Sequence, residues 1–384
     1  MKRIVSISDC SELDAYKGDW TRLSEAEPYF VPDLGLLQRD LRVSGNKFRL
    51  LAVRENSQTK ALACFIYCDT IKRFEFATRK LFELSAREVS LYGSCVLGQP
   101  DEETIRELFR LAFEGLNFDL INAGEILVDS PLYRVLTSFS GLAAWRLTRK
   151  QELRWLVRLP DTFDSYMSSL RPTAKTRVLR DVRKFEREQP EYRLMCRAED
   201  VDVFLREAEL VSRRTYQWQL GYGVNNDAQF REHLLWLARN GLFRGYIVSL
   251  DGKSCTFGWG EMNRRTFIFR ATGYDPQYRV LSPGTALIMH MIRDLIDNTT
   301  CEMFDFGAGS EDGYKSRLGT ISLPCARMAA APIYRPYPML LAGLDLSVNL
   351  TKNSIMKMME TVAASSILRR RLKSVLRPLG VSSY

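Results

Sequence analysis

Apolar residues alternate with polar ones, or run on continuously, in several short stretches of the first 150 residues, and this pattern predicts strands. The stretches are 48–56, 61–76 and 87–98, and a further strand is expected at 119–129. Residues 101–116 instead place their apolar positions at helical spacing, after an acidic opening that complements a helix dipole. The first 150 residues are therefore predicted to form one mixed α/β unit.

The second half of the chain follows the same order with different residues. Helices are predicted over 162–190, 199–218 and 227–241, followed by strands at 242–252, 253–263 and 265–275. A helix over 283–298 and strands at 301–307 and 322–332 complete this half. Each half is thus a meander of strands, then a helix, then a returning strand, with residues 145–160 as the connection.

A chain of 384 residues is long enough for two domains of ordinary size. The predicted boundaries are an N-terminal domain at 1–150, a C-terminal domain at 151–335 and a basic, amphipathic helical tail at 336–384. A hydrophobic content of 46% and a charged content of 26% are typical of a soluble globular protein. No run of eighteen apolar residues predicts a transmembrane helix, and the N-terminus has no secretory pattern.

The net charge of +9 is concentrated in two segments. Residues 171–187 and residues 336–384 each hold seven Lys or Arg against two acidic residues. The remainder of the chain is close to neutral, so these two segments are where an anionic partner is expected.

Several kinds of catalytic site have no counterpart in the sequence. The eight cysteines include no CxxC pair and the two histidines lie on separate segments, so no metal site is expected and the thiols suit a reducing cytoplasm. GxSxG, HExxH and Walker A motifs do not occur. Chemistry by positioning and electrostatic stabilisation stays open.

The segment that leads into the predicted helix at 283–298 offers an anion-binding site. Pro283 suits the first helical turn, because its missing N–H would be unpaired there in any case. Three amides are expected to point outward at the positive end of the helix dipole: those of Gly284, Thr285 and Ala286. Arg279 stands near enough to add a charge. The alternative is an ordinary helix start capped by Ser282.

Residues 171–187 form a predicted helix with a basic stripe that includes Arg177 and Arg180, opposite an apolar stripe. The stripe either guides a phosphate-bearing ligand or is a solvated helix face. Nucleic acid is less favoured, because no aromatic residues interleave with the arginines. In the next aromatic cluster, at 213–223, Trp218 and Tyr222 either line a groove for a flat or sugar-like substrate or belong to the core between domains.

The stretch FDFGAGSEDGYKSRLGT, residues 304–320, contains more glycine than a plain turn needs. A strand-like run carries Asp305 near its end, and the chain then passes through Gly307, Gly309 and a third glycine to Tyr314 and Lys315. This freedom of the backbone indicates a close approach to a ligand.

Residues 165–325 resemble the BioF2-like acyltransferase domain, the CelD/BcsL group within the wider GNAT and FemAB-like superfamily. The residues that carry the resemblance are GYDPQYRVLSPGTAL followed by FDFGAGSEDGYKSRLG. It implies tandem GNAT-like domains, each a mixed and mostly antiparallel sheet flanked by helices. It also implies acyl-CoA as cosubstrate and no permanently bound cofactor.

The resemblance further implies roles for individual residues. Gly284 and Ala286 would be a remnant of the loop that binds the donor's pyrophosphate, and Lys315 would stabilise the reacting carbonyl. Asp305 would orient this lysine or accept the nucleophile's proton. The remaining candidates for the site, taken from the same segments, are Arg279, Ser282, Thr285 and Tyr314 with Arg177, Arg180, Trp218, Tyr222 and Gly309.

The predicted function is transfer of an acyl group from acyl-CoA to an amine or hydroxyl of a polysaccharide or cell-envelope precursor. The first alternative is a FemAB-like aminoacyl transferase that uses aminoacyl-tRNA. The second is a catalytically silent protein of the membrane surface or of a complex, because residues 367–379 form a basic amphipathic pattern. The expected location is the cytoplasm, with peripheral contact at the inner membrane face through 336–384 or with the tail docked on its own domain.

Overall fold

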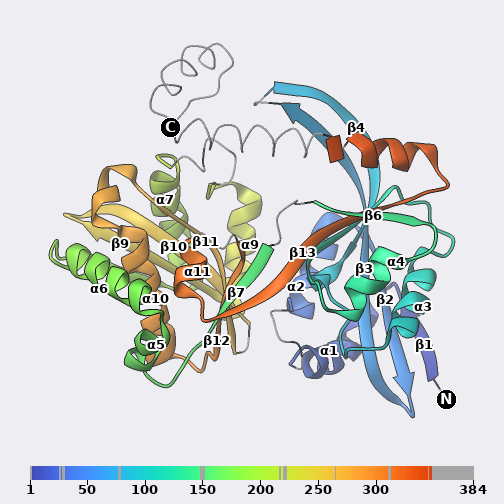
Figure 1. Ribbon diagram of the computed structural model, residues 1–384, viewed down its shortest axis with the longest axis horizontal. Coiled ribbons are helices and arrows are strands. Elements are labelled where there is room, and N and C mark those ends of the chain that lie inside the picture. Colours follow the sequence, from blue (N-terminus) through green and yellow to red (C-terminus); the bar gives the residue numbers. More distant parts are fainter. Residues whose placement is uncertain are drawn as a thin grey trace. The chain divides into compact units, whose positions relative to one another are not determined.

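The chain divides into two units, each with its own core. Unit 1 comprises Met1–Gln151 and Pro324–Tyr384, and unit 2 comprises Glu152–Leu323. The computed structural model (Figure 1) describes residues 2–25, 27, 31–76, 79–147, 152–215, 218, 223–263, 265–309, 313–344 and 346–347.

Unit 1 is built on a mixed sheet with helices on both faces. Its strands are β1 (Lys2–Ile7), β2 (Lys47–Glu55), β3 (Gln58–Phe76), β4 (Arg79–Leu91), β5 (Leu120–Leu127), β6 (Leu142–Arg146) and most of β13 (Ile321–Pro332). Strands β1 to β4 pair antiparallel in turn, β4 and β5 pair parallel, and β13 lies antiparallel to both β5 and β6. The helical segments are η1 (Cys10–Tyr16), α1 (Lys17–Ser24), α2 (Leu34–Ser44), η2 (Tyr92–Ser94), α3 (Glu102–Phe113) and α4 (Pro131–Ser138).

The alternation of side chains along β2 shows why both faces of this sheet are covered. Leu51 and Val53 lie in the core that also contains side chains of α3 and α4, whereas Leu50 and Ala52 lie in the core with α1 and α2. A strand whose two faces are both apolar must be covered on both sides.

Unit 2 repeats this arrangement. Its sheet has the order β7-β12-β11-β10-β9-β8, and β11 and β12 pair parallel while the other neighbours pair antiparallel. The strands are β7 (Glu152–Arg158), β8 (Glu191–Met195), β9 (Phe243–Leu250), β10 (Lys253–Asn263), β11 (Thr266–Tyr274) and β12 (Met303–Gly309). The helical segments are α5 (Phe163–Ser169), α6 (Pro172–Glu186), η3 (Ala198–Asp200), α7 (Val201–Ser212), α9 (Ala228–Arg239), η4 (Pro276–Leu281), α10 (Pro283–Asn298) and α11 (Tyr314–Leu318).

In Figure 1, α5, α6 and α10 lie together against the sheet of unit 2, and α7 and α9 form a second pair. Both units contain the predicted order of three strands, a helix and a returning strand, as β2-β3-β4-α3-β5 and β9-β10-β11-α10-β12. The prediction of a mixed α/β protein with tandem GNAT-like halves is therefore confirmed.

Three local predictions differ from the structure. The helix predicted over 162–190 is two helices, since Leu170 and Arg171 precede Pro172 in extended conformations that a following proline favours. The connection predicted at 145–160 contains all of β7 and the end of β6. Residues 324–332, expected in the C-terminal domain, pair with β5 and β6 of unit 1.

The tail predicted at 336–384 is described only at its beginning, where residues 336–344 are helical. The amphipathic pattern at 367–379 lies outside the described residues. Within the described part of the chain, no helix is long and apolar enough to cross a membrane.

Candidate functional site

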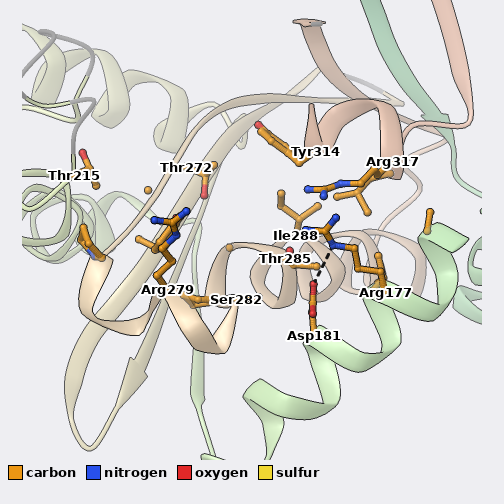
Figure 2. Close-up of a pocket in the computed structure, with 18 residues that line it drawn as sticks. Arg177, Asp181, Thr215, Thr272, Arg279, Ser282, Thr285, Ile288, Tyr314 and Arg317 are labelled. Carbon is orange, nitrogen blue, oxygen red and sulfur yellow. Dashed lines mark ion pairs between the residues drawn. The ribbon is translucent and has the colours of Figure 1, made fainter. Parts of the chain in front are cut away.

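Unit 2 contains a cavity of about 490 Å³ at the carboxyl end of β11. Its walls come from the end of β11, the turn η4, the first turns of α10, one side of α6 and the short helix α11 (Figure 2). Three arginines line it: Arg177, Arg279 and Arg317. One carboxylate, that of Asp181, stands against them in the lining.

The cavity lies where two parallel strands separate. β11 and β12 are in register at three pairs only, from Thr266 opposite Met303 to Ile268 opposite Asp305. Beyond that point β11 continues to Tyr274 and stays paired with β10 on its other side. The end of β11 therefore has an edge towards β12 that no described strand occupies. Ligands of open α/β sheets bind in this position, beyond the carboxyl ends of parallel strands.

One end of the cavity is the start of α10, with Arg279, Ser282 and Gly284, and we call it the helix-start end. Ser282 has a left-handed backbone (φ 58°) and no side-chain capping bond, so the ordinary capped start is not what the structure contains. The amides of Thr285 and Ala286 both donate to the Ser282 carbonyl, at 3.1 and 3.4 Å. Among the described residues no acceptor meets the amide of Gly284.

Of the three amides predicted to bind an anion, the amide of Gly284 is therefore the one that is left for a ligand. Gly284 has no side chain, so a ligand can approach its backbone closely. The space beside it is open, because the nearest atom to a Cβ built at this position would be Cδ1 of Tyr274, at 3.6 Å. Thr285 lines the cavity, but Ala286 is 1% exposed and packs in the core. The left-handed backbone of Ser282 is a strained conformation, and strained residues of this type are frequent at ligand-binding sites.

The other end of the cavity contains Arg177 of α6 and Arg317 of α11, and we call it the arginine-pair end. Figure 2 shows Arg279 at one end and Arg177 with Arg317 at the other, with the first turns of α10 between them. Burial, and next the charge of Arg177, lower the pKa of Arg317. Asp181 contacts Arg177 at 3.9 Å and Arg180 at 3.0 Å.

Arg180, predicted to bind substrate beside Arg177, is not part of the cavity wall. Its side chain is 72% exposed and its guanidinium group binds Asp181. Helical geometry explains the difference, because Arg177 and Asp181 are four residues apart on one face and Arg180 is turned aside.

The position of the Lys315 side chain explains why two positions in residues 304–320 are glycine. Its Nζ donates to the carbonyl oxygen of Ala308 at 2.8 Å, and its stem crosses Gly309. A Cβ at Gly309 would lie 2.9 Å from Cδ of Lys315, and one at Gly307 would lie 3.8 Å from Nζ. Gly309 thus supports the lysine, and neither Gly309 nor Lys315 is among the residues that line the cavity, whereas Tyr314, the residue before Lys315, does line it.

Asp305 has a different environment from the one expected. It is fully buried, and its Oδ2 accepts bonds from Nε and Nη2 of Arg154 at 2.9 and 2.5 Å. Its Oδ1 accepts from the amide of Gly307 at 2.7 Å. Gly307 has φ 69° and closes a bulge between Asp305 and itself in the pairing of β12 with β7. We therefore propose a structural role for Asp305 in place of the two predicted ones, which were to orient Lys315 or to accept the nucleophile's proton.

The aromatic cluster at 213–223 is described only in part. Trp218 is half-buried, lies under the guanidinium group of Arg213 at 5.4 Å and is not in the cavity wall. Tyr222 lies outside the described residues. The choice between a substrate groove and a domain core stays open for both residues.

Sequence reasoning missed Arg317 and Asp181. The signal for Arg317 was its spacing, because it follows Tyr314 by three residues and a single helical turn brings the two to one side. The signal for Asp181 was an acidic residue one turn after Arg177. In the described part of the chain no three His, Cys, Asp or Glu side chains cluster as metal ligands.

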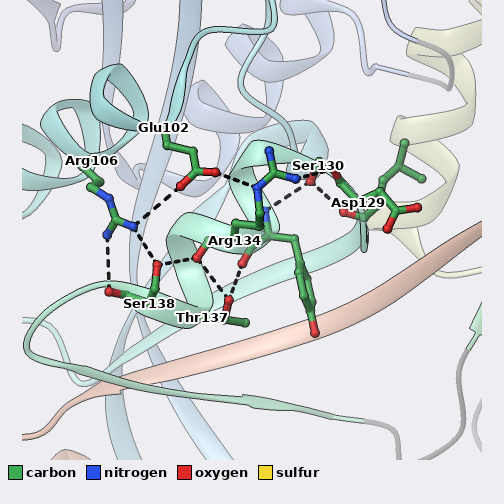
Figure 3. Close-up of polar contacts among 9 residues, drawn as sticks. Glu102, Arg106, Asp129, Ser130, Arg134, Thr137 and Ser138 are labelled. Carbon is green, nitrogen blue, oxygen red and sulfur yellow. Dashed lines mark hydrogen bonds and ion pairs between the residues drawn. The ribbon is translucent and has the colours of Figure 1, made fainter.

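The equivalent position in unit 1 has the opposite charge. There α3 follows β4 as α10 follows β11, but the carboxylate of Asp101 caps α3 by accepting from the amide of Thr104 at 2.8 Å. The first residue of α3, Glu102, is bound by Arg134 at 2.6 Å (Figure 3). A helix start already satisfied by carboxylates does not attract an anion, so of these two helix starts the one of α10 has the features of an anion site.

The comparisons with known proteins agree with this arrangement. Residues 173–316 match the family model "Acetyltransferase (GNAT) domain". A search of curated protein sequences finds no match. The chain is similar in structure to FemX, with 11% identity and a TM-score of 0.59 over 88% of this chain and 99% of FemX.

Two further solved structures are similar. One is a conserved protein of unknown function from Bacteroides thetaiotaomicron, with 13% identity and a TM-score of 0.51 over 86% of this chain and 99% of that one. The other is the C-terminal domain of a putative lysylphosphatidylglycerol synthetase from Agrobacterium fabrum, with 13% identity and a TM-score of 0.50 over 88% and 96%.

The chain has the fold of FemX, and residues 173–316 are similar to the acetyltransferase (GNAT) domain. The likeness to the GNAT domain supports an acyltransferase activity for unit 2. The narrower resemblance to the BioF2-like, CelD/BcsL group stays a prediction.

Proposed function

We propose that the protein transfers an acyl group from acyl-CoA to an amine or hydroxyl of a polysaccharide or cell-envelope precursor, within the cavity of unit 2. The observation that carries the proposal is the juxtaposition of an open β11 edge with the helix-start end. An extended donor pairs with a free strand edge, and a diphosphate binds amides at a helix start. The acceptor class comes from the resemblance to envelope-modifying transferases.

The helix-start end supplies the groups for the donor's diphosphate. Gly284 and Arg279 both line the cavity, and the dipole of the sixteen-residue α10 adds positive potential there. Ser282 and Thr285 place two hydroxyl-bearing residues in the same wall.

The reaction joins the acceptor's nitrogen or oxygen to the thioester carbon, and the carbon–sulfur bond then breaks to release the CoA thiol. Negative charge develops on the carbonyl oxygen, and we assign its stabilisation to Lys315, which Gly309 and the Ala308 carbonyl hold at the end of β12. Lys315 is not in the cavity wall, so this role requires its Nζ to turn from the Ala308 carbonyl towards the cavity. Tyr314 lines the cavity beside it and is placed to contact the acyl group. One such stabilising group is worth on the order of 10²–10³ in rate.

The test is binding of CoA and a panel of acyl-CoAs, measured by thermal shift and calorimetry. A ligand at a hundred times its dissociation constant adds about 2.7 kcal/mol of stability. Arg279→Gln removes one hydrogen-bonding charge, worth about 1.5–3 kcal/mol, so CoA affinity should fall by about ten- to a hundredfold. Arg180→Gln, on the outside of α6, is the matched control and should bind CoA as the wild type does. Absence of any shift with every acyl-CoA would contradict the proposal.

One observation favours the aminoacyl-tRNA alternative, namely the exposed row of basic residues on α6. These side chains are exposed along the helix: Arg171, Arg177, Arg180, Arg183, Lys184 and Arg187. A tRNA-dependent enzyme would show a mobility shift with charged tRNA that weakens steeply with salt. It would show no CoA affinity, so the two functions separate in the same pair of assays.

A further inference from the structure

The arginine-pair end of the cavity is not used by the donor contacts proposed above. Arg177 reaches it from α6 and Arg317 from α11, and both line the cavity. Within the described residues, Arg317 has no hydrogen bond or ion pair, and the carboxylate nearest to Arg177 is that of Asp181 at 3.9 Å. Figure 2 shows both guanidinium groups directed into the space below Tyr314.

This end of the cavity carries unbalanced positive charge. Asp181 is the single acidic residue in the wall, and it binds Arg180 through two bonds of 3.0 and 3.2 Å. Its charge is therefore shared between Arg180 and the weaker contact with Arg177. The partly buried guanidinium group of Arg317 and the more exposed one of Arg177, 57% exposed, repel each other, and an anion between them removes that repulsion while accepting their hydrogen bonds.

We propose that Arg177 and Arg317 bind a phosphoryl group carried by the acceptor substrate. This inference rests on the proposed function, because it takes the helix-start end as the donor's site. A phosphoryl group fits better than a carboxylate, since its charge approaches −2 and it offers three oxygens to two guanidinium forks. The acceptor class is thereby narrowed to a phosphate-bearing precursor, and Arg177 and Arg317 become specificity-determining residues.

The first turns of α10 separate this site from the donor's end (Figure 2). The two sites come from different elements, η4 and α10 at one end and α6 and α11 at the other. Substitutions at one end can therefore be read independently of the other. Arg183 supplies a matched control, because it is exposed on α6 and is outside the cavity wall.

The test is calorimetric titration of inorganic phosphate into the full-length protein saturated with CoA, at constant ionic strength set by sodium chloride. Phosphate should bind the wild type, and Arg317→Gln and Arg177→Gln should each weaken it by about tenfold or more, the loss of one charged hydrogen bond. Both variants should bind CoA within about twofold of wild type, and Arg183→Gln should change neither affinity. Arg279→Gln should weaken CoA alone. A parallel titration with acetate distinguishes a phosphoryl group from a carboxylate.

Each other result overturns a specific part of the inference. Phosphate binding that is absent, or unchanged in both Arg317→Gln and Arg177→Gln, removes the site. Loss of CoA affinity in Arg317→Gln assigns the arginine pair to the donor, which overturns this inference and leaves the proposed function standing. Acetate bound as tightly as phosphate overturns the phosphoryl assignment. Phosphate binding that depends on Arg317 in a protein with no CoA affinity supports the site and contradicts the proposed function.

Discussion

Replacing Asp305 by asparagine tests whether this residue holds the end of β12 or takes part in the reaction. Asp305 is fully buried and its partner Arg154 is 8% exposed, so the substitution removes the carboxylate charge from a buried ion pair. Breaking such a pair costs about 3–5 kcal/mol. The asparagine oxygen keeps one hydrogen bond of about 1 kcal/mol, so unit 2 should lose about 2–4 kcal/mol of unfolding free energy.

The measurement is hydrogen exchange of peptides from β7 and β12 as a function of urea, because exchange reports the unfolding of unit 2 separately from unit 1. The control is Asp202→Asn in the same unit, where Asp202 and Arg231 form an exposed ion pair with side chains 59% and 40% exposed. That substitution should cost no more than about 1 kcal/mol. If Asp305→Asn costs as little as the control, the structural role is wrong. If the folded variant binds acyl-CoA normally but has lost turnover, Asp305 acts in the chemistry after all.

Three further substitutions probe the turn and the helix that position the site. Gly309→Ala places a Cβ 2.9 Å from Cδ of Lys315, so turnover should fall while CoA affinity stays near wild type; unchanged turnover would mean that this lysine position is not needed. Gly307→Ala puts an alanine at φ 69° and should lower the urea midpoint of unit 2 by the equivalent of about 1–2 kcal/mol, whereas an unchanged midpoint would contradict the bulge geometry. Burial lowers the pKa of His290, which stacks on Tyr192 at 4.1 Å, so the folded state binds fewer protons than the unfolded one. Stability should therefore fall as the pH drops below about 6.5, by up to about 1.4 kcal/mol per pH unit. The His290→Phe variant should lose this part of the dependence in urea unfolding between pH 5 and 8, and an identical profile would refute the argument.

The repeated order of strands and helices could be predicted from the sequence, because each element is indicated by a local pattern of apolar and polar residues. Residues 101–116 and 283–298 have helical spacing, and each is followed by a strand that returns parallel to the one before the helix. The break at Pro172 was also a local signal, but it was overridden by the apolar spacing on both sides. Strand β6 was missed, since Leu142–Arg146 is a short edge strand whose pairing with β13 depends on residues nearly 190 positions away.

The site was predictable only where its residues lie on one element. Arg279, Ser282 and Gly284 lie close together in sequence. The start of the helix in which they meet was predicted from Pro283 and the residues around it. The partner of Asp305 is 151 residues away in β7, so no sequence spacing could identify it. The same holds for the arginine-pair end, where α6 and α11 meet at the cavity.

The two units show how one arrangement of strands and helix can leave a helix start open to a ligand in one copy and close it in the other. In unit 1 the hydroxyl of Ser94, just beyond β4, accepts a hydrogen bond from the amide of Gly124 at 2.9 Å. This amide of β5 is therefore already paired within the protein and is not available to a ligand. The helix that follows is capped by its own carboxylate, Asp101. In unit 2 the corresponding helix begins with Pro283 and Gly284, which bring no side-chain acceptor. The difference between the copies therefore lies in a few residues at a helix start, and these residues decide whether its dipole is neutralised internally or left for a ligand.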